Sequence, residues 1–230
     1  MSEQVRDMFA EIAGKYDFLN SFLSLGIHKL WRRKAVRLSE VREGMSVLDC
    51  ASGTGDLAIS YKKSVGDSGI VVGTDFCVEM LEPAKPKADK LGLEIKFEFA
   101  DVMDLQYEDD TFDLASISFG IRNVDDPVKG MAEMARVVKP GGKIVVIEFG
   151  QPKGLFKIPY DLYSKKIMPA IGKLISKDDF AYNYLPETAA KFPCRCDFID
   201  LMKQTGKLEN CDFYPLTFGV AFIYIGTVKV

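Results

Sequence analysis

The stretch that decides the fold is Val47-Leu48-Asp49-Cys50-Ala51-Ser52-Gly53-Thr54-Gly55-Asp56. It begins as a short apolar strand, passes through a loop with two glycines and enters a helical pattern over residues 55–64. Glycines let the backbone approach a ligand where a Cβ atom would clash, and the first turn of a helix offers free N–H donors. We therefore expect a strand-to-helix elbow that binds a small molecule.

Strand-like and helix-like patterns alternate on both sides of this elbow up to about residue 150. Strand patterns cover residues 46–49, 69–75, 95–99, 112–118 and 143–149, and helical patterns lie at about 55–64, 77–91 and 125–138. Near-continuous β-branched runs separated by helices indicate a parallel sheet with helices on both faces. Pro140-Gly141-Gly142 predicts a turn into the fifth strand. Pro83 and Pro86 predict a late start or a kink in the helix over 77–91.

The two ends of the chain extend this core. Residues 1–44 are helix-rich, and their basic segment 29–37 is either an anion-binding or membrane-surface patch or a solvated helix face with Leu30 and Trp31 packed inward. Residues 151–195 combine lysines, apolar side chains and helix-breaking prolines, which is typical of a lid made of short helices. A helix near 196–205 precedes strand patterns at about 208–214 and 217–228, joined near Pro215, which predict an antiparallel pair.

These patterns predict an α/β protein whose sheet has seven strands, mostly parallel, with an antiparallel C-terminal strand. We expect one domain over residues 1–230. Its parts are a helical N-terminal extension (1–44), a cofactor-binding half (45–150), an inserted lid (151–195) and a closing helix with antiparallel strands (196–230).

Composition excludes several classes of function. Lys+Arg is 30 and Asp+Glu is 33, so the net charge of −3 lacks the basic excess of a nucleic-acid-binding protein. His28 is the single histidine, and the five cysteines form no Cys-x-x-Cys pair, so we expect no metal site. No secretory signal and no apolar run of 18 residues is present, and we expect a cytoplasmic protein with reduced thiols.

Carboxylates near the elbow indicate which ligand it binds. Asp75 lies twenty residues past Gly55, at the end of the second strand, where a carboxylate can accept hydrogen bonds from ribose hydroxyls. Asp49 and Asp56 flank the loop with negative charge, which repels a pyrophosphate and suits an ammonium group. Asp101, at the end of the third strand, is placed to accept from an exocyclic amine. The ligand that combines ribose, adenine, an ammonium and a sulfonium is S-adenosylmethionine.

A dinucleotide remains the alternative ligand. Gly53, Gly55 and Ala58 also fit the G-x-G-x-x-A fingerprint of NAD(P)-binding proteins. A nucleotide-binding oxidoreductase or a non-catalytic binding module therefore stays open beside a methyltransferase.

Together with other segments, the elbow resembles the S-adenosylmethionine-dependent methyltransferases with a Rossmann-like sheet, and more narrowly the C-methyltransferases of ubiquinone and menaquinone biosynthesis. The resemblance runs almost the whole length of the chain. It is carried by residues 5–9, 15–20, 23–31, 117–125, 136–142, 182–188 and 192–193, of which 117–125 (Ile-Ser-Phe-Gly-Ile-Arg-Asn-Val-Asp) is the most diagnostic.

The resemblance implies a reaction and a set of site residues. The reaction is methyl transfer from S-adenosylmethionine, without a metal, to the ring of a prenylated quinol, either demethylmenaquinol or the ubiquinol precursor or both. S-Adenosylhomocysteine is the expected product. With the elbow residues and Phe76, which follows Asp75, the candidate cofactor-binding residues are Asp49, Gly53, Thr54, Gly55, Asp75, Phe76, Asp101, Val102 and Ser118. A different small acceptor remains the alternative substrate.

The candidate catalytic residues follow the fourth strand. Arg122 is expected to hold the developing phenolate or to polarise a water that takes the proton, and the competing interpretation is an ion pair with Asp125 or Asp126. Asn123 would orient the ring oxygen. Tyr16 and, more weakly, Tyr182 are candidates for the pocket wall. His28 is read as structural rather than as a base.

A prenylated quinol needs an apolar access route. Residues 155–175, with Tyr160, Tyr163, Phe180 and Tyr184, are expected to form that groove. The lysines of this region suit an anionic membrane at about 1 kcal/mol each. Peripheral contact with the inner face of the membrane is therefore expected, and a homodimer surface is the alternative use of these residues.

Overall fold

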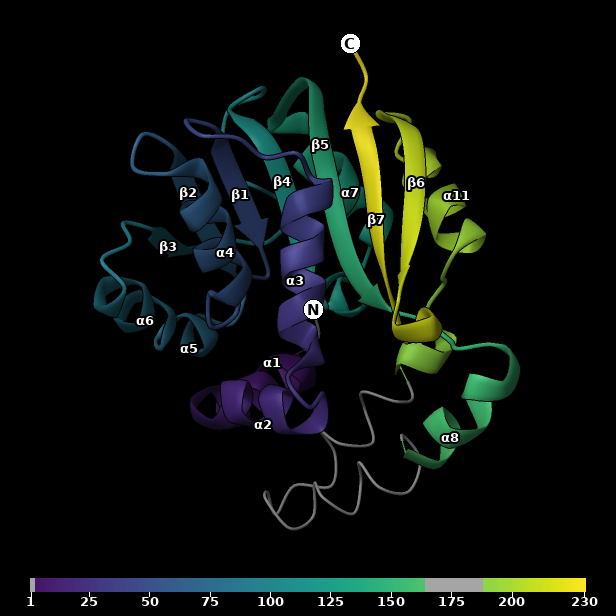
Figure 1. The fold of residues 1–230 in the computed structure, drawn as a ribbon. Helices are drawn as coiled ribbons and strands as arrows, with labels where there is room; N and C mark the ends of the chain where they lie inside the picture. Colours follow the sequence, from purple (N-terminus) through teal and green to yellow (C-terminus); the bar gives the residue numbers. More distant parts are fainter. Residues whose placement is uncertain (1–2, 164–187) are drawn as a thin grey trace.

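The computed structural model describes residues 3–163 and 188–230. In these residues seven strands form one sheet in the order β3-β2-β1-β4-β5-β7-β6, with helices on both faces (Figure 1). The strands are β1 (Ser46–Cys50), β2 (Ile70–Asp75), β3 (Lys96–Phe99), β4 (Phe112–Ser118), β5 (Val138–Phe149), β6 (Leu208–Leu216) and β7 (Ala221–Val228). The first five run parallel, and β7 is antiparallel to both β5 and β6. The predicted mostly parallel α/β sheet is confirmed.

Alternation along β1 divides the core between two layers. Successive side chains of a strand point to opposite faces of a sheet. Val47 joins a cluster with Trp31 of α3 (Ile27–Leu38) and residues of α4 (Asp56–Val65). Leu48 joins the opposite cluster, with residues of α7 (Pro127–Arg136) and α11 (Cys196–Gln204). The strand before the elbow is thus buried on both sides, which fixes the position of the elbow.

Proline positions explain the segmentation of the second helical pattern. The residues predicted as one helix over 77–91 form α5 (Val78–Leu81) and α6 (Ala84–Lys90), with Pro83 between them. Pro86 lies in the first turn of α6, where its missing N–H would have no helical partner in any case. The predicted interruption by Pro83 is confirmed.

Two strand boundaries differ from the sequence prediction. β5 begins at Val138 and includes the Pro140-Gly141-Gly142 segment, because Val138 pairs with Phe112 before the register shifts and Lys143 pairs with Leu114. Pro215 lies inside β6, opposite Phe222, instead of in the join to β7. β6 is the edge strand of the sheet, so a proline without an N–H is tolerated there.

The N-terminal extension is helical as predicted, and it lies at the functional end of the sheet. It consists of α1 (Glu3–Ile12), α2 (Tyr16–Leu23) and α3. Figure 1 shows α1 and α2 at the end of the sheet toward which the arrows of β1 and β5 point. Trp31 is buried, and its Nε1 donates to Thr217 Oγ1 at 2.9 Å. Leu30, by contrast, is 60% exposed, so the expectation that both side chains pack inward is wrong for Leu30.

The start of the predicted lid forms short helical segments. A 3₁₀ turn (Gly154–Phe156) leads into α8 (Lys157–Leu162). The expectations for Phe180, Tyr182 and Tyr184 fall outside the described residues. Across the described ranges, no helix is long and apolar enough to cross a membrane. A single domain over residues 1–230 stays a prediction.

Candidate active site

The elbow after β1 has the backbone conformation that its glycines predict. Gly53 and Gly55 have φ values of +54° and +78°, a region that residues with a Cβ rarely adopt. A Cβ at Gly55 would meet the Phe97 ring at 2.8 Å, and one at Gly53 would meet Met80 Cε at 3.2 Å. At either glycine, a residue with a Cβ atom would strain the backbone and crowd the neighbouring side chain.

A cavity of about 670 Å³ lies beside the elbow at the carboxyl ends of the parallel strands. This is the edge of an open α/β sheet at which ligands bind. Its lining residues are Phe9, Tyr16, Ala51, Gly53, Asp75, Phe76, Met80, Ala100, Asp101, Val102, Ser118, Phe119, Gly120, Asn123 and Val124. Most of the predicted cofactor-binding residues are among them.

Asp75 is held by the backbone of two neighbouring segments. The Gly53 N–H donates to its Oδ2 at 2.8 Å, and the Cys77 N–H donates to its Oδ1 at 2.9 Å. The carboxyl is 9% exposed, and burial raises its pKa to about 6 despite these two bonds. Each carboxylate oxygen accepts more than one hydrogen bond, so a fixed acceptor pair remains available to hydroxyl donors.

The third strand supplies a second backbone-held carboxylate and an aromatic wall. Asp101 Oδ1 accepts from the Met103 N–H at 2.9 Å. The ring of Phe76 lies 5.6 Å from that of Phe99, and Phe76 and Val102 both line the cavity. Apolar walls with a carboxylate at one edge form a slot that suits a planar base carrying an exocyclic amine.

A second, smaller cavity of about 350 Å³ continues past the elbow. It shares five lining residues with the larger one and is lined by Tyr16, Arg32, Asp49, Ala51, Ser52, Gly53, Thr54, Asp56, Leu57, Ser118 and Phe119. Asp49, at 1% exposure, is the most deeply buried carboxyl of this cavity. The Ser116 hydroxyl donates to Asp49 Oδ1 at 2.6 Å, while Asp49 Oδ2 has no partner among the described residues.

Burial gives Asp49 an unusual pKa. Desolvation raises the pKa of this carboxyl to about 7, although the Ser116 hydroxyl and the Arg32 cation oppose the shift. A buried acceptor without a partner is costly, and an ammonium group in the cavity would supply both the missing donor and a compensating charge. This orphaned oxygen is the observation that fits an amino-acid moiety at this end of the site.

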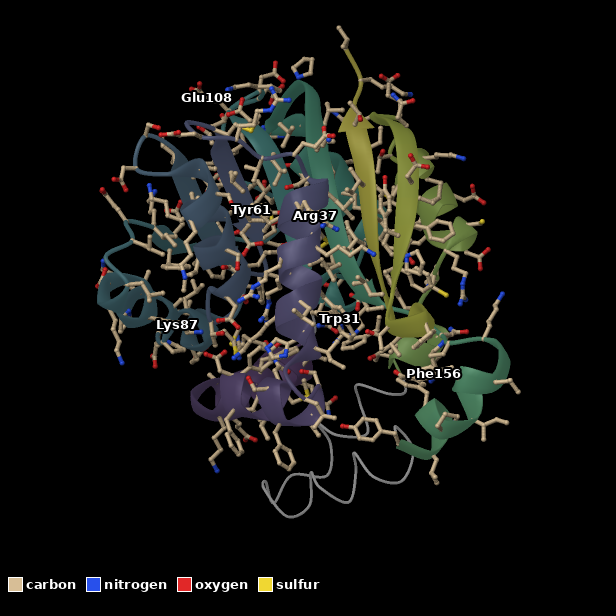
Figure 2. All side chains as sticks on the ribbon, viewed as in Figure 1. Trp31, Arg37, Tyr61, Lys87, Glu108 and Phe156 are labelled. Carbon is tan, nitrogen blue, oxygen red and sulfur yellow. The ribbon has the colours of Figure 1, made fainter. Side chains whose placement is uncertain are left out.

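Four charged side chains form a network beside the smaller cavity, and two of them, Arg32 and Asp56, line it. Lys87 of α6 contacts Asp17 of α2, and its Nζ lies 2.9 Å from Asp56 Oδ1. Arg32 Nη1 of α3 donates to Asp56 Oδ2 at 2.7 Å. The Thr54 hydroxyl donates to Asp17 Oδ1 at 2.5 Å. Figure 2 shows Lys87 toward the same end of the molecule as α1 and α2.

These contacts change the interpretation of Asp56. Its two oxygens are each paired with a cation, so Asp56 does not present a free negative charge beside the loop. Of the two carboxylates that flank the loop, only Asp49 therefore has an oxygen left to attract an ammonium.

The proposed catalytic residues occupy different positions. Asn123 lines the larger cavity and Tyr16 lines both. Arg122 lines neither cavity. Its Nη1 lies 2.8 Å from Glu148 Oε1 and donates to the Phe119 carbonyl at 2.5 Å, and the two side chains of the ion pair are 5% and 1% exposed. The ion-pair partner is thus Glu148 of β5, not Asp125 or Asp126.

His28 also lies away from both cavities. Its Nδ1 is 2.5 Å from Ser24 Oγ, and burial together with the Arg32 cation lowers its pKa to about 4. These contacts are those of a structural histidine. Within the part of the chain that the structure describes, no cluster of three or more His, Cys, Asp or Glu residues is arranged to hold a metal ion.

Sequence reasoning missed two residues that matter here. Arg32 lies in the basic segment that was read as a surface, yet it lines the smaller cavity. Glu148 lies in an apolar strand run, and a charged residue between Ile147 and Phe149 was the available signal for a buried ion pair.

Comparisons with known proteins agree with this geometry. A model of the ubiE/COQ5 methyltransferase family matches residues 1–228. The chain is 54% identical over 228 residues to a ubiquinone/menaquinone biosynthesis C-methyltransferase of Bdellovibrio bacteriovorus, covering 99% of this chain and 97% of that protein. It is 41% identical over 226 residues to a demethylmenaquinone methyltransferase of Bacillus cereus, covering 97% and 95%.

Among solved structures, a SAM-dependent methyltransferase of Thermotoga maritima superposes with a TM-score of 0.68. The sequences are 20% identical, and the match covers 97% of this chain and 99% of the other. At this identity the similarity concerns the fold alone.

Proposed function

The chain belongs to the ubiE/COQ5 methyltransferase family, and on that premise we propose that it transfers the methyl group of S-adenosylmethionine to a ring carbon of a prenylated quinol. The substrate we assign is demethylmenaquinol, since the names of both relatives include the menaquinone series. The ubiquinol precursor is the second substrate, because the name of the more similar relative includes it as well.

The observation that carries this proposal is the row of three aspartates along the two cavities. Asp75 is fixed to accept from ribose hydroxyls, Asp101 from the adenine amine, and Asp49 from the ammonium of the amino-acid end. The glycine turn leaves backbone room between them. A pyrophosphate would instead meet the buried Asp49 carboxyl, which disfavours a dinucleotide.

When bound, S-adenosylmethionine supplies an electrophilic methyl group, so the protein has no need of a metal for this transfer. The chain's own task is to align the acceptor carbon with that methyl group and to exclude water. Ser118, the last residue of β4, and Phe119 line both cavities, and Asn123, which lines the larger one, is proposed to hold the ring oxygen. Tyr16 forms the wall contributed by the N-terminal extension.

The acceptor carbon becomes electron-rich once a ring hydroxyl loses its proton. A charged arginine is a poor base, and Arg122 is already paired with Glu148 and the Phe119 carbonyl. We therefore assign Arg122 a positioning role: it fixes the backbone of residues 119–123, so that Asn123 faces the cavity. A further contribution of its positive charge to stabilising the phenolate acts at longer range.

Access of a prenyl chain is proposed from the end of the molecule that carries α2 and α8. Exposed apolar side chains lie on these helices and directly beside them, and their described members are Phe18, Phe22, Leu25, Leu155, Ile158 and Leu162. The ring centroids of Phe156 and Phe218 lie 4.8 Å apart, and this contact connects the start of the lid to the β6–β7 join. Figure 2 shows Phe156 beside α8. We propose that this apolar surface, flanked by Lys153 and Lys157, rests on an anionic membrane.

Two assays test the proposal. Calorimetry should detect binding of S-adenosylhomocysteine and no binding of NAD⁺. The rate of labelled methyl transfer should be higher with demethylmenaquinol than with a panel of small phenols. Binding of NAD⁺ without binding of S-adenosylhomocysteine would contradict the methyltransferase assignment and favour an oxidoreductase. Equal methyl transfer to unrelated acceptors would contradict the quinol as the substrate.

Membrane contact is tested separately. Pelleting with phosphatidylglycerol vesicles should be lost at high salt and reduced by Phe22→Ser. Concentration-dependent dimerisation in solution, abolished by the same substitution, would instead assign the surface to a second copy.

A further inference from the structure

Arg32 is a cavity-lining cation whose role the proposed function leaves open. It lies on α3, within the basic segment 29–37, and lines the smaller cavity together with Asp49. Its side chain is 11% exposed. Among the described residues its single hydrogen bond runs from Nη1 to Asp56, so most of the five N–H donors of the guanidinium remain for other acceptors.

Asp56, the partner of Arg32, has a second cation in place. Lys87 Nζ lies 2.9 Å from Asp56 Oδ1, while Arg32 uses the other oxygen. If Arg32 turned toward a ligand, Asp56 would keep the Lys87 ion pair and no carboxylate would be left without a counterion. The cluster is therefore built so that Arg32 can change partner at small cost.

The chemistry of the smaller cavity calls for such a cation. An amino-acid moiety carries an ammonium and a carboxylate on the same carbon, and the orphaned Asp49 Oδ2 accounts only for the ammonium. A carboxylate placed there would lie near the buried Asp49 carboxyl and would be repelled unless a cation were present. Arg32 is the cation that lines this cavity, and its planar fork matches a carboxylate bidentately.

We propose that Arg32 binds the α-carboxylate of S-adenosylmethionine. When the cofactor binds, Arg32 leaves Asp56, and Lys87 remains as the cation paired with Asp56. This inference rests on the proposed function, and it adds the residue that recognises the carboxylate end of the cofactor. It also assigns the N-terminal extension a direct part in cofactor binding, because α3 belongs to that extension.

The test compares two ligands that share the adenosine. S-Adenosylhomocysteine carries the amino-acid end, and 5′-methylthioadenosine lacks it. By calorimetry, Arg32→Met should weaken S-adenosylhomocysteine binding by about ten- to a hundredfold, the range for a charge-assisted hydrogen bond. Binding of 5′-methylthioadenosine should change by less than about twofold. Arg32→Lys should recover part of the lost affinity.

Lys87→Met is the matched control. It removes the other cation of Asp56, but Lys87 does not line either cavity. Lys87→Met should therefore weaken S-adenosylhomocysteine binding less than Arg32→Met does. If Arg32 served only to tie α3 to Asp56, Arg32→Met would weaken the binding of S-adenosylhomocysteine and 5′-methylthioadenosine to the same extent, and that result would overturn the inference. Unchanged S-adenosylhomocysteine affinity in Arg32→Met would overturn it as well.

A ligand-side measurement keeps the test decisive if Arg32→Met does not fold. The methyl ester of S-adenosylhomocysteine removes the negative charge, and wild-type protein should bind it at least tenfold more weakly than the acid. Equal affinity for ester and acid would sink the inference while leaving the proposed function intact. Wild-type protein that binds neither S-adenosylhomocysteine nor 5′-methylthioadenosine would sink both.

Discussion

The two ends of the proposed cofactor site are built in different ways. At the strand ends, Asp75 and Asp101 are held by backbone N–H groups, and the Arg122–Glu148 pair between the turn after β4 and strand β5 is almost fully buried. At the N-terminal extension, the contacts are between side chains. Asp17, Lys87 and Asp56 are each between 26% and 43% exposed, and they link three different helices and the elbow.

This difference separates a fixed part from an adjustable part. A backbone donor cannot move without moving its strand, whereas a partly solvated ion pair exchanges partners at small cost. The adenosine end therefore presents a preformed geometry, and the amino-acid end is closed by groups that can rearrange around the ligand. Measurements on both ends can break or sharpen this contrast.

The largest effect is expected from the buried ion pair of the fixed part. Arg122→Met leaves Glu148 charged, unpaired and 1% exposed, which should lower the free energy of unfolding by about 3–5 kcal/mol. Urea denaturation measures this change. Lys85→Met breaks the exposed Lys85–Asp89 pair and should cost less than about 0.5 kcal/mol. Equal losses in the two variants would mean that the strand-end region is no more rigid than an exposed helix face.

The next effect concerns cofactor affinity at the fixed end. Asp75→Ala removes the acceptor proposed for the ribose hydroxyls and should cost about 1.5–3 kcal/mol in S-adenosylhomocysteine binding, tenfold or more. Calorimetry checks the value. Asp113→Ala is the control, because Asp113 lies at the opposite end of β4 and pairs with Lys139. An unchanged affinity in the Asp75 variant would remove the ribose role.

The pH dependence of binding probes the junction between the two ends. Burial raises the pKa of Asp49 to about 7, and an ammonium favours the ionised carboxylate. Affinity for S-adenosylhomocysteine should therefore rise about tenfold between pH 6 and pH 8, or roughly 1.4 kcal/mol. In Asp49→Asn this rise should shrink to the small part that Asp75 contributes. For 5′-methylthioadenosine, which lacks the ammonium, the rise should be small and should follow Asp75, whose pKa is about 6.

Stability of the ligand-free protein should change in the opposite direction. The pKa of Asp49 in the folded state lies above its ordinary value of 3.8, so the group favours folding at low pH and this contribution is lost as pH rises from about 4 through 7. The slope of unfolding free energy against pH should reach at most about 1.4 kcal/mol per unit for this proton. A slope that persists in Asp49→Asn would assign it to other groups.

The smallest effect is expected from the adjustable end. Asp17→Asn weakens the contacts with Lys87 and Thr54, which are partly exposed, and should change the free energy of unfolding by less than about 1 kcal/mol. Urea denaturation of the Asp17 and Arg122 variants measures both changes in the free energy of unfolding under the same conditions. A loss above about 2 kcal/mol would show that the extension is as firmly fixed as the strand ends.

Much of the strand-end region was predictable from local sequence. The glycine turn, Asp75 and Asp101 are defined by their distance from strands whose apolar runs are unmistakable, and parallel strands bring their carboxyl ends to one edge. The break at Pro83 followed from the ring that replaces its N–H. Asn123 was predicted for the same reason as the aspartates, because it follows a strand end.

The errors lie where distant segments meet. Arg122 was expected at the reacting ring, and the competing interpretation paired it with Asp125 or Asp126, which are close in sequence. Its partner is Glu148, which the pairing of β4 with β5 brings alongside. Asp56 was read as a free negative charge because Arg32 and Lys87 are 24 and 31 residues away. Leu30 was placed inside together with Trp31 when segment 29–37 was interpreted as a solvated helix face. Successive helix residues point in different directions, and Leu30 is exposed.

The sequence by itself determined the sheet, the elbow and the identity of the backbone-held carboxylates, because periodicity, glycine and strand ends act over a few residues. Only the tertiary structure decided which charges neutralise one another and that α3 places Arg32 in the cavity with Asp49. The reason is that an ion pair depends on distance in space and on burial, and both are set by how strands and helices far apart in the chain pack together.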